Sequence, residues 1–210
     1  MDILNVIDFF EKIIKPENII NYGGLGLLLF VVYAETGLFV GFFLPGDSLM
    51  FTTGLLTATK VLDYPIGIIV LLVHITAFAG NQSGYFFGRY TGMALFKRKE
   101  SLLFKPSHLI LAKNFYDKHG GKALILGQFL PIVRTFSPIV AGVINMNYSQ
   151  FFILSLTGTF IWIYSLIFTG YFLGIQFPYI KNYLDYIVIF LIIITTIPII
   201  IGYRKNKKKP

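Results

Sequence analysis

The sequence contains no cysteine and few charged residues. Without cysteine in its 210 residues, it forms no disulfide bond and performs no thiolate chemistry. Charged side chains make up 13% of the chain and hydrophobic ones 55%. A soluble protein of this length needs more polar surface, so the composition predicts an all-α integral membrane protein with one membrane domain.

Motifs of enzymes and of nucleotide-binding proteins are also missing. The three histidines lack metal-ligand spacing, no Ser, His and Asp nucleophile set is evident, and the glycines at 80–92 are not followed by Gly-Lys-Ser or Gly-Lys-Thr. We therefore expect no enzymatic activity, no metal and no cofactor. The N-terminus lacks a basic segment before an apolar stretch, so we expect no cleaved signal peptide.

The net charge of +8 is distributed in a way that predicts membrane topology rather than nucleic-acid binding. Residues 89–122 hold eight Lys or Arg and two acids, and residues 204–210 hold five basic residues and no acid. Because Lys and Arg concentrate in cytoplasmic segments, we place both on the inside and interpret the C-terminal tail as a topology anchor. The links near 59–64 and 175–183 then lie outside, as does the N-terminus.

The apolar pattern divides the chain into helices. The spacing of Ile3, Leu4, Ile7 and Phe10 predicts an amphipathic surface helix within residues 1–20, followed by a single membrane domain at 21–203. Full spans are predicted at 64–88, 149–174 and 183–203, and a short surface helix is predicted from Ser107 to His119.

Residues 24–58 are apolar but interrupted at Pro45-Gly46-Asp47. The half after the break, Ser48 to Ala58, is shorter than the ~20 residues that cross a bilayer. Either one kinked helix crosses and a loop follows, or a re-entrant hairpin enters and returns on one side. The charge distribution favours the hairpin.

A second broken segment, 122–145, carries Pro131 and Pro138 on either side of Arg134. Both broken segments contain Phe-Leu-Pro, then a charge, then small residues, which indicates an internal inverted repeat. Paired broken segments of opposite orientation are typical of transporter sites near the bilayer midplane. Non-helical backbone at that depth implies a protein-enclosed or water-filled interior.

Three charges fall in these apolar segments, namely Glu35, Asp47 and Arg134. Each costs at least ~2.5–3.5 kcal/mol at the centre of a bilayer. They form either an ion-pair network that only holds the hairpins together, or a site where the carboxylates exchange protons and Arg134 binds an anion. Arg suits phosphate because its planar fork donates two parallel hydrogen bonds.

The predicted span at 64–88 carries small and polar residues on regular positions. Gly80, Gly84, Gly88 and Gly92 recur every four residues, which predicts close approach of another helix. The polar residues at 81–83 are expected to form interhelical hydrogen bonds.

The combined motifs resemble the DedA family of bacterial inner-membrane proteins, which shares a domain with eukaryotic lipid scramblases. The resemblance covers roughly residues 25–175. It consists of E-x9-P-G-D from Glu35 to Asp47, GNQSGYFFGRYTG at 80–92 and FLPIVRTFSPIVAG at 129–142, followed by Phe151, Gly158 and Trp162.

The resemblance implies two opposed re-entrant hairpins, lipid transport with undecaprenyl phosphate or phosphatidylethanolamine-type lipids as substrates, and dependence on the proton gradient. Two positions depart from the family pattern. Gln128 stands where members often carry Arg, and Asn81 stands where they often carry Asp.

Our first hypothesis is a lipid flippase or scramblase of the bacterial inner membrane, multi-pass and with a cytoplasmic C-terminus. Arg134, assisted by Gln128, would hold the phosphate of a polyprenyl lipid, and Glu35 and Asp47 would carry protons. The alternatives are a proton-coupled transporter of small cations or drugs, and a membrane scaffold. The expected partners are membrane lipids and protons, not nucleic acid, and a homo-oligomer stays open.

Overall fold

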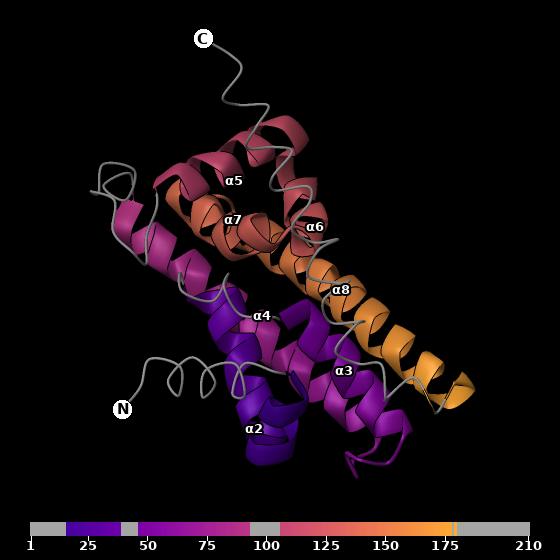
Figure 1. Ribbon diagram of the computed structural model, residues 1–210. Coiled ribbons are helices and arrows are strands. Elements are labelled where there is room, and N and C mark those ends of the chain that lie inside the picture. The colour runs from indigo at the N-terminus through magenta and orange to yellow at the C-terminus, as the bar shows by residue number, and fades with distance from the viewer. Residues whose placement is uncertain (1–15, 39–45, 93–105, 178, 180–210) are drawn as a thin grey trace, which may run out of the picture.

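The computed structural model describes residues 16–38, 46–92, 106–177 and 179, and within them every regular element is helical (Figure 1). The elements follow in the order α2 (Pro16–Gly37), α3 (Gly46–Ala58), α4 (Ile66–Thr91), α5 (Pro106–His119), η3 (Gly120–Lys122), α6 (Ala123–Leu126), η4 (Gly127–Phe129), α7 (Pro131–Val143) and α8 (Tyr148–Gln176). The predicted all-helical fold is therefore confirmed for these residues. The predicted span at 183–203, the tail 204–210 and residues 1–15 of the predicted surface helix lie outside them.

Two long helices, α4 and α8, are long and apolar enough to cross a membrane. With 26 and 29 residues they extend about 39 and 44 Å, more than the ~30 Å hydrocarbon core. They coincide with the predicted spans at 64–88 and 149–174. The side chain of Asn147 caps α8 by accepting hydrogen bonds from the backbone N–H groups of Ser149 at 3.0 Å and Gln150 at 3.3 Å.

Two short helices, α3 and α7, lie against the long ones. Each has 13 residues, or about 20 Å, less than the thickness of the hydrocarbon core. Both are buried on nearly all sides, and α7 is buried from Ile132 to Val143. The short helix α3 packs mainly on α8, whereas α7 packs mainly on α4.

The two halves of the chain pack against each other through their short helices. In the first half of the chain α2 packs on α4, and in the second half α6 packs on α8. Each half then lays its short helix on the long helix of the other half, as the crossing of α3, α4, α7 and α8 in Figure 1 shows. The two broken segments of the sequence therefore occupy equivalent positions in the fold.

Glycines bring these helices into backbone contact. A methyl group on Gly54 of α3 or Gly170 of α8 would overlap the main chain of the opposite helix. The same holds for Gly88 of α4 and Gly142 of α7. Both crossings therefore use one glycine from each helix, which lets the axes approach closely.

The predicted glycine stripe on α4 is used over most of its length. Gly80 faces α2, and Gly84 and Gly88 face α7. Gly92 is an exception, because it has φ +57° and no heavy atom of the described residues lies within 4 Å of the place where a methyl group would stand. It ends α4 instead, donating its backbone N–H to the carbonyl of Gly88.

The second break in the chain falls at Leu130, whose backbone is extended, and Pro131 starts α7. Pro138, which we predicted at the same break, lies instead inside α7. Proline removes the hydrogen bond to the carbonyl four residues earlier, here that of Arg134, but α7 continues through it to Val143. Pro45, predicted at the first break, lies outside the described residues.

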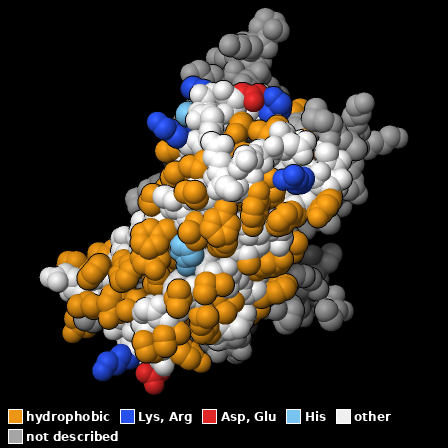
Figure 2. All heavy atoms as spheres, turned by 180° about the vertical axis from the view of Figure 1, so that it is seen from behind, with side chains coloured by type: hydrophobic (Ala, Val, Ile, Leu, Met, Phe, Trp, Pro, Cys, Tyr) orange, Lys and Arg blue, Asp and Glu red, His pale blue; other side chains and the backbone are white. Residues whose placement is uncertain are grey.

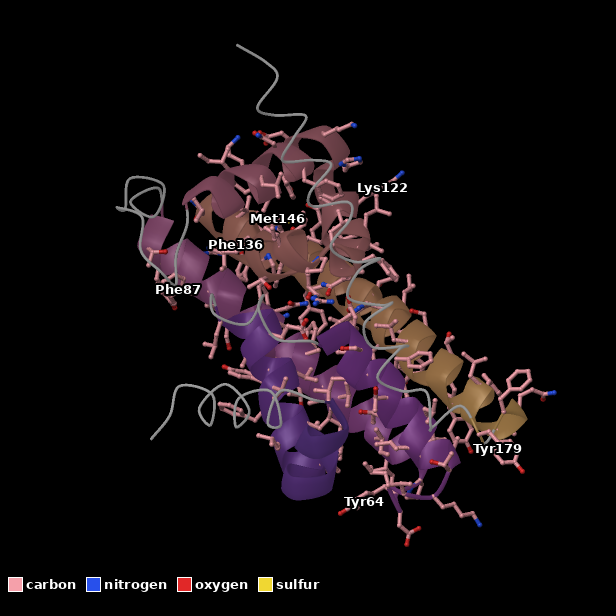
Figure 3. The ribbon with its side chains drawn as sticks, in the orientation of Figure 1. Tyr64, Phe87, Lys122, Phe136, Met146 and Tyr179 are labelled. Carbon is pink, nitrogen blue, oxygen red and sulfur yellow. The ribbon has the colours of Figure 1, made fainter. Side chains whose placement is uncertain are left out.

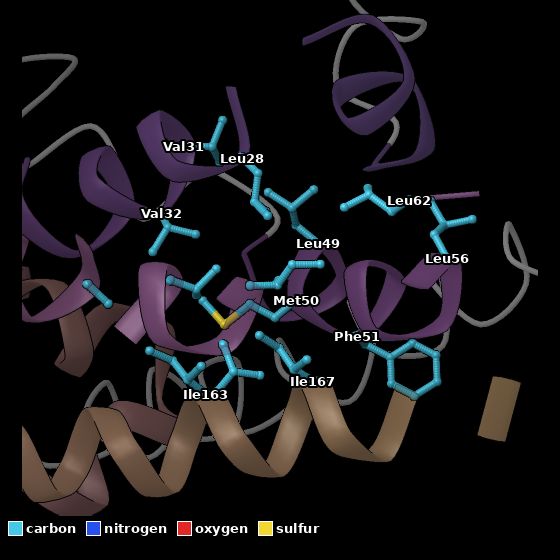
Figure 4. Packing of buried hydrophobic residues seen from close by; sticks show 14 of the residues in the cluster. Leu28, Val31, Val32, Leu49, Met50, Phe51, Leu56, Leu62, Ile163 and Ile167 are labelled. Atoms are coloured by element: carbon cyan, nitrogen blue, oxygen red, sulfur yellow. The ribbon is translucent and has the colours of Figure 1, made fainter. Parts of the chain in front are cut away.

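An apolar cluster fills the space between α2, α3, α4 and α8. Figure 4 shows Leu28 and Val32 of α2, Met50 of α3 and Ile163 and Ile167 of α8 pointing into it. On the face seen in Figure 2, hydrophobic side chains form a broad band and the charged ones gather toward its two ends.

The two ends of the molecule differ in the segments they carry. Lys122 lies at one end, and Tyr64 and Tyr179 lie at the other (Figure 3). We call these the Lys122 end and the Tyr64 end. The assignment of 89–122 to one side of the membrane and of 59–64 and 175–183 to the other stays a prediction.

Candidate functional site

The three charges predicted from sequence converge at one place. Glu35 lies near the end of α2, Asp47 in the first turn of α3, and Arg134 in the first turn of α7. The side chains of Glu35 and Arg134 are fully enclosed, and that of Asp47 is 13% exposed. The starts of both short helices thus meet the end of α2.

Arg134 bridges the two carboxylates. Its Nη2 donates to Oε1 of Glu35, and its Nη1 donates to Oδ1 of Asp47 at 2.6 Å. The same Nη1 also donates to the backbone carbonyl of Gln128 at 3.3 Å. Two negative charges and one positive charge leave the cluster with a net charge of −1, and Nε of Arg134 and Oε2 of Glu35 have no hydrogen-bond partner among the described residues.

Trp162 of α8 completes the cluster, and sequence reasoning missed its role. Its Nε1–H donates to Oδ1 of Asp47 at 2.9 Å, and its ring centroid lies 4.2 Å from Cζ of Arg134. The ring therefore contacts the cation while its N–H contacts the anion. One signal was present in the sequence, because tryptophans in membrane helices favour the interface and this one lies in the middle of a span.

Gly46 and Thr135 make room for Glu35 and orient it. A methyl group on Gly46 would occupy the position of the Glu35 carboxylate. Thr135 donates its hydroxyl to the backbone carbonyl of Glu35 at 3.0 Å, which ties α7 to the end of α2. The glycine of the Pro-Gly-Asp motif is therefore required by space as well as by the chain break.

Gln128 was predicted to assist Arg134 with its side chain. The structure brings its backbone carbonyl to Arg134, while its side chain packs against Gly158 of α8. The side chain is buried, and its Oε1 has no partner within the described part of the chain. The amide is thus beside the cluster without being bonded to it.

Two of the three polar residues at 81–83 form the expected interhelical hydrogen bonds. Asn81 donates from Nδ2 to Oγ of Ser155 on α8 at 3.0 Å, and Ser83 pairs with the hydroxyl of Tyr33 on α2 at 2.8 Å. The side-chain N and O of Gln82 have no partner among the described residues.

The site's chemistry is that of two carboxylates, a guanidinium and an indole. Among the residues that the structure describes, no three His, Cys, Asp or Glu side chains gather where they would hold a metal ion. The guanidinium binds anions, the carboxylates accept protons, and each carboxylate competes with any external anion for the same donors.

Comparison with known proteins places this arrangement in a wider group. Residues 44–172 match the VTT domain. The chain is 37% identical to protein DedA of Escherichia coli K12 over 182 residues, covering 87% of this chain and 83% of the relative. It is 35% identical to an uncharacterized membrane protein of Mycobacterium tuberculosis H37Rv, covering 87% and 82% of the two chains.

A third relative is the inner membrane protein YqjA of Escherichia coli K12, at 32% identity over 92% of this chain and 86% of the relative. No solved structure matches the chain.

Proposed function

This chain belongs to the DedA family of VTT-domain membrane proteins, and on that premise we propose that it moves an anionic lipid, such as undecaprenyl phosphate, between the leaflets of the bacterial inner membrane. The observation that carries the proposal is the enclosed bridge from Arg134 to Glu35 and Asp47. A phosphate group needs the same two donors that the carboxylates now occupy.

Proton coupling follows from this competition. Ionised Glu35 and Asp47 hold Arg134 in place, whereas a protonated carboxyl group is a weaker acceptor and releases the guanidinium. A phosphate then replaces the carboxylate on Arg134, and loss of the proton on the other side returns the bridge and expels the phosphate. In this scheme the net charge of −1 keeps anions out until a proton arrives.

The two short helices supply the path in our proposal. Both α3 and α7 are too short to cross the hydrocarbon core and both begin at the charge cluster. We interpret them as the inner limbs of two re-entrant hairpins that start from opposite sides and meet at mid-depth. Separation of the hairpins would open a polar groove for the headgroup while the lipid tail stays in the bilayer.

The test is leaflet exchange of undecaprenyl phosphate in proteoliposomes. We expect wild-type protein to speed exchange, and Arg134→Gln to abolish this. Because Arg134→Gln changes the cluster charge from −1 to −2, the matched variant is Glu35→Gln/Arg134→Gln, which restores −1. It is expected to be folded and still inactive. Full activity of this folded double variant would rule out Arg134 as the phosphate ligand.

The negative net charge of the cluster favours a second candidate, a proton-coupled transporter of small cations or drugs. The same variants separate the two. A cation transporter retains part of its exchange activity when Arg134 is replaced, whereas a lipid transporter loses it. A scaffold, the third hypothesis, predicts that neutralising the charges lowers folded yield and cellular activity in parallel.

A further inference from the structure

We propose that Asn81, Gln128, Ser137 and Ser155 line a hydrated chamber that connects Arg134 with the Lys122 end of the molecule. The chamber takes water and, through water, protons. This inference does not depend on which lipid, if any, the protein transports.

The four side chains are polar and buried, and three of them carry an oxygen atom without a hydrogen-bond partner among the described residues. None is more than 2% exposed. Oδ1 of Asn81, Oε1 of Gln128 and Oγ of Ser137 have no hydrogen-bond partner among the described residues, and neither does Nε of Arg134. Buried polar atoms in native proteins are almost always bonded to protein or to ordered water, so several orphans in one region indicate water.

Contacts connect these residues into one wall. Asn81 donates to Ser155, and Ser155 lies one turn from Gly158, against which the Gln128 side chain packs. The neighbouring Gly127 faces the hydroxyl of Ser137, with 3.2 Å between its methyl position and Oγ. Gln128 in turn contacts Arg134 through its carbonyl.

The wall lies on the Lys122 side of the charge cluster. Trp162 marks the cluster on α8, and Ser155 is seven residues closer to the start of that helix, a rise of about 10 Å. The start of α8 follows Met146, which Figure 3 shows toward the Lys122 end. Ser137 likewise lies one turn beyond Arg134 on α7, toward Gly142 and its contact with Arg89.

The two ends are sealed unequally. Toward the Tyr64 end, sixteen buried residues of α2, α3, α4, α8 and the α3–α4 link form the apolar cluster described above. Toward the Lys122 end the described residues form two smaller clusters. One has six buried residues on α5 and α7, and the other has five, namely Tyr85, Leu124, Ala141, Met146 and Phe151. The apolar cover toward the Lys122 end is thus divided into two smaller clusters, and the polar wall lies on that same side. We therefore place the entry of water at the Lys122 end.

The smaller of these two clusters contains polar contacts. The hydroxyl of Tyr85 donates to the carbonyl of Met146 at 2.6 Å, and it accepts a hydrogen bond from Nη1 of Arg89 at 2.9 Å. Arg89 is exposed. Hydrogen-bonding groups therefore run from the surface into this cluster as far as the Met146 carbonyl. On α3, the hydroxyls of Thr53 and Thr57 are bonded to their own helix, and that of Thr52 has no partner among the described residues.

Thiol labelling tests the chamber directly, because the natural chain has no cysteine. Ser137→Cys and Ser155→Cys would be treated with a charged, membrane-impermeant methanethiosulfonate in right-side-out and in everted vesicles. The exposed positions in Lys60→Cys and Lys122→Cys report which side the reagent reaches. We expect both chamber thiols to react from the side on which Lys122→Cys reacts.

Thr53→Cys is the matched control, since Thr53 is a buried hydroxyl residue on α3 beside the apolar cluster. The chamber thiols should react about ten times faster or more than this control, because only a solvated thiolate attacks the reagent. Reaction of both no faster than Thr53→Cys would overturn the proposal. Reaction from the Lys60 side would overturn its direction. Two chamber positions are labelled so that the test can still be read if one of the two variants does not fold.

Discussion

Replacement of Arg134 should reduce the stability of the protein strongly, because its positive charge stabilises two buried carboxylates. Its removal leaves Glu35 and Asp47 enclosed without a counter-charge. We predict that Arg134→Gln lowers the free energy of unfolding by about 3–5 kcal/mol, the usual range for breaking one side of a buried ion pair. Thermal unfolding of the purified protein in detergent measures the loss.

The double variant Glu35→Gln/Arg134→Gln should regain most of that stability, because one buried charge is removed with the other. Recovery would show that the single variant suffers from an unpaired charge rather than from lost packing of the Arg134 side chain on Trp162. If both variants unfold at the same temperature, the bridge does not carry the stability we assign to it.

Gly46 offers a second test at the same scale. A methyl group there would overlap the Glu35 carboxylate, so Gly46→Ala should displace Glu35 from Arg134. We expect Gly46→Ala to destabilise the protein by about 1–3 kcal/mol, as overpacking of a well-filled core does, and to reduce transport. The measurement is again thermal unfolding, followed by leaflet exchange.

Gly26→Ala is the control for this change. Gly26 lies in α2, and no atom of the described part of the chain is within 4 Å of the added methyl. Alanine should therefore leave stability unchanged or raise it by up to about 1 kcal/mol through helix propensity. Equal losses at the two positions would mean that glycine flexibility, not space for Glu35, explains Gly46.

The sequence predicted those site residues whose burial in an apolar segment costs free energy. Glu35, Asp47 and Arg134 stood out because charges in apolar segments are expensive, and they do converge. Trp162 did not stand out, because an aromatic residue in a span carries no such penalty. Its role depends on which face of α8 meets Asp47, which is a matter of tertiary packing.

At the scale of elements, the hydrophobic pattern located α4 and α8 to within a few residues. It did not resolve the segment between His119 and Pro131, where three short helices, η3, α6 and η4, follow one another with three or four residues each. It also misread Pro138 as a break, because a proline signal is local, whereas the helix through it is enclosed by its neighbours. Glycine spacing predicted that α4 would be closely packed but not by which helix.

The two glycine crossings lead to a prediction about the elements themselves. Gly170→Ala should force α3 and α8 apart, and Gly142→Ala should do the same to α7 and α4. We expect each to reduce the free energy of unfolding by about 1–3 kcal/mol. Similar losses at both positions are expected, because the two crossings are built in the same way.

Gly67→Ala provides the comparison, since no described residue comes within 4 Å of a methyl group on Gly67 of α4. Thermal unfolding should show it unchanged or slightly more stable. A large loss at only one of the two crossings would contradict the equivalence of the two halves of the chain.

At the scale of the whole molecule, the exchange of partners between halves explains why the charge cluster is where it is. Each short helix begins at the break of its own half and lies on the long helix of the other, so both breaks are brought to one level between α4 and α8. Opposite charges at the two breaks, Asp47 on α3 and Arg134 on α7, then hold the halves together. Any movement of one half against the other must stretch this bond.

The apolar clusters toward the Tyr64 end and the Lys122 end differ, so the two sides of the molecule are not equivalent. If protons reach Glu35 and Asp47 from the Lys122 end, transport should quicken when the pH on that side falls and respond much less to the pH on the Tyr64 side. The reason is that protonation of a carboxylate frees donors of Arg134. Working above the second phosphate pKa of about 6 keeps the charge of the substrate nearly constant.

Leaflet exchange in right-side-out and everted vesicles, with each bath buffered separately, measures this asymmetry. Glu35→Gln is the control, because an amide cannot ionise and its hydrogen bond to Arg134 no longer depends on pH; its exchange rate should respond less to either bath. Equal responses from the two sides would mean that water reaches the charge cluster as readily through the apolar cluster as past Tyr85. The sixteen buried residues of the apolar cluster argue against that route. The sign of the pH effect thus tests the bridge, and its sidedness tests the chamber.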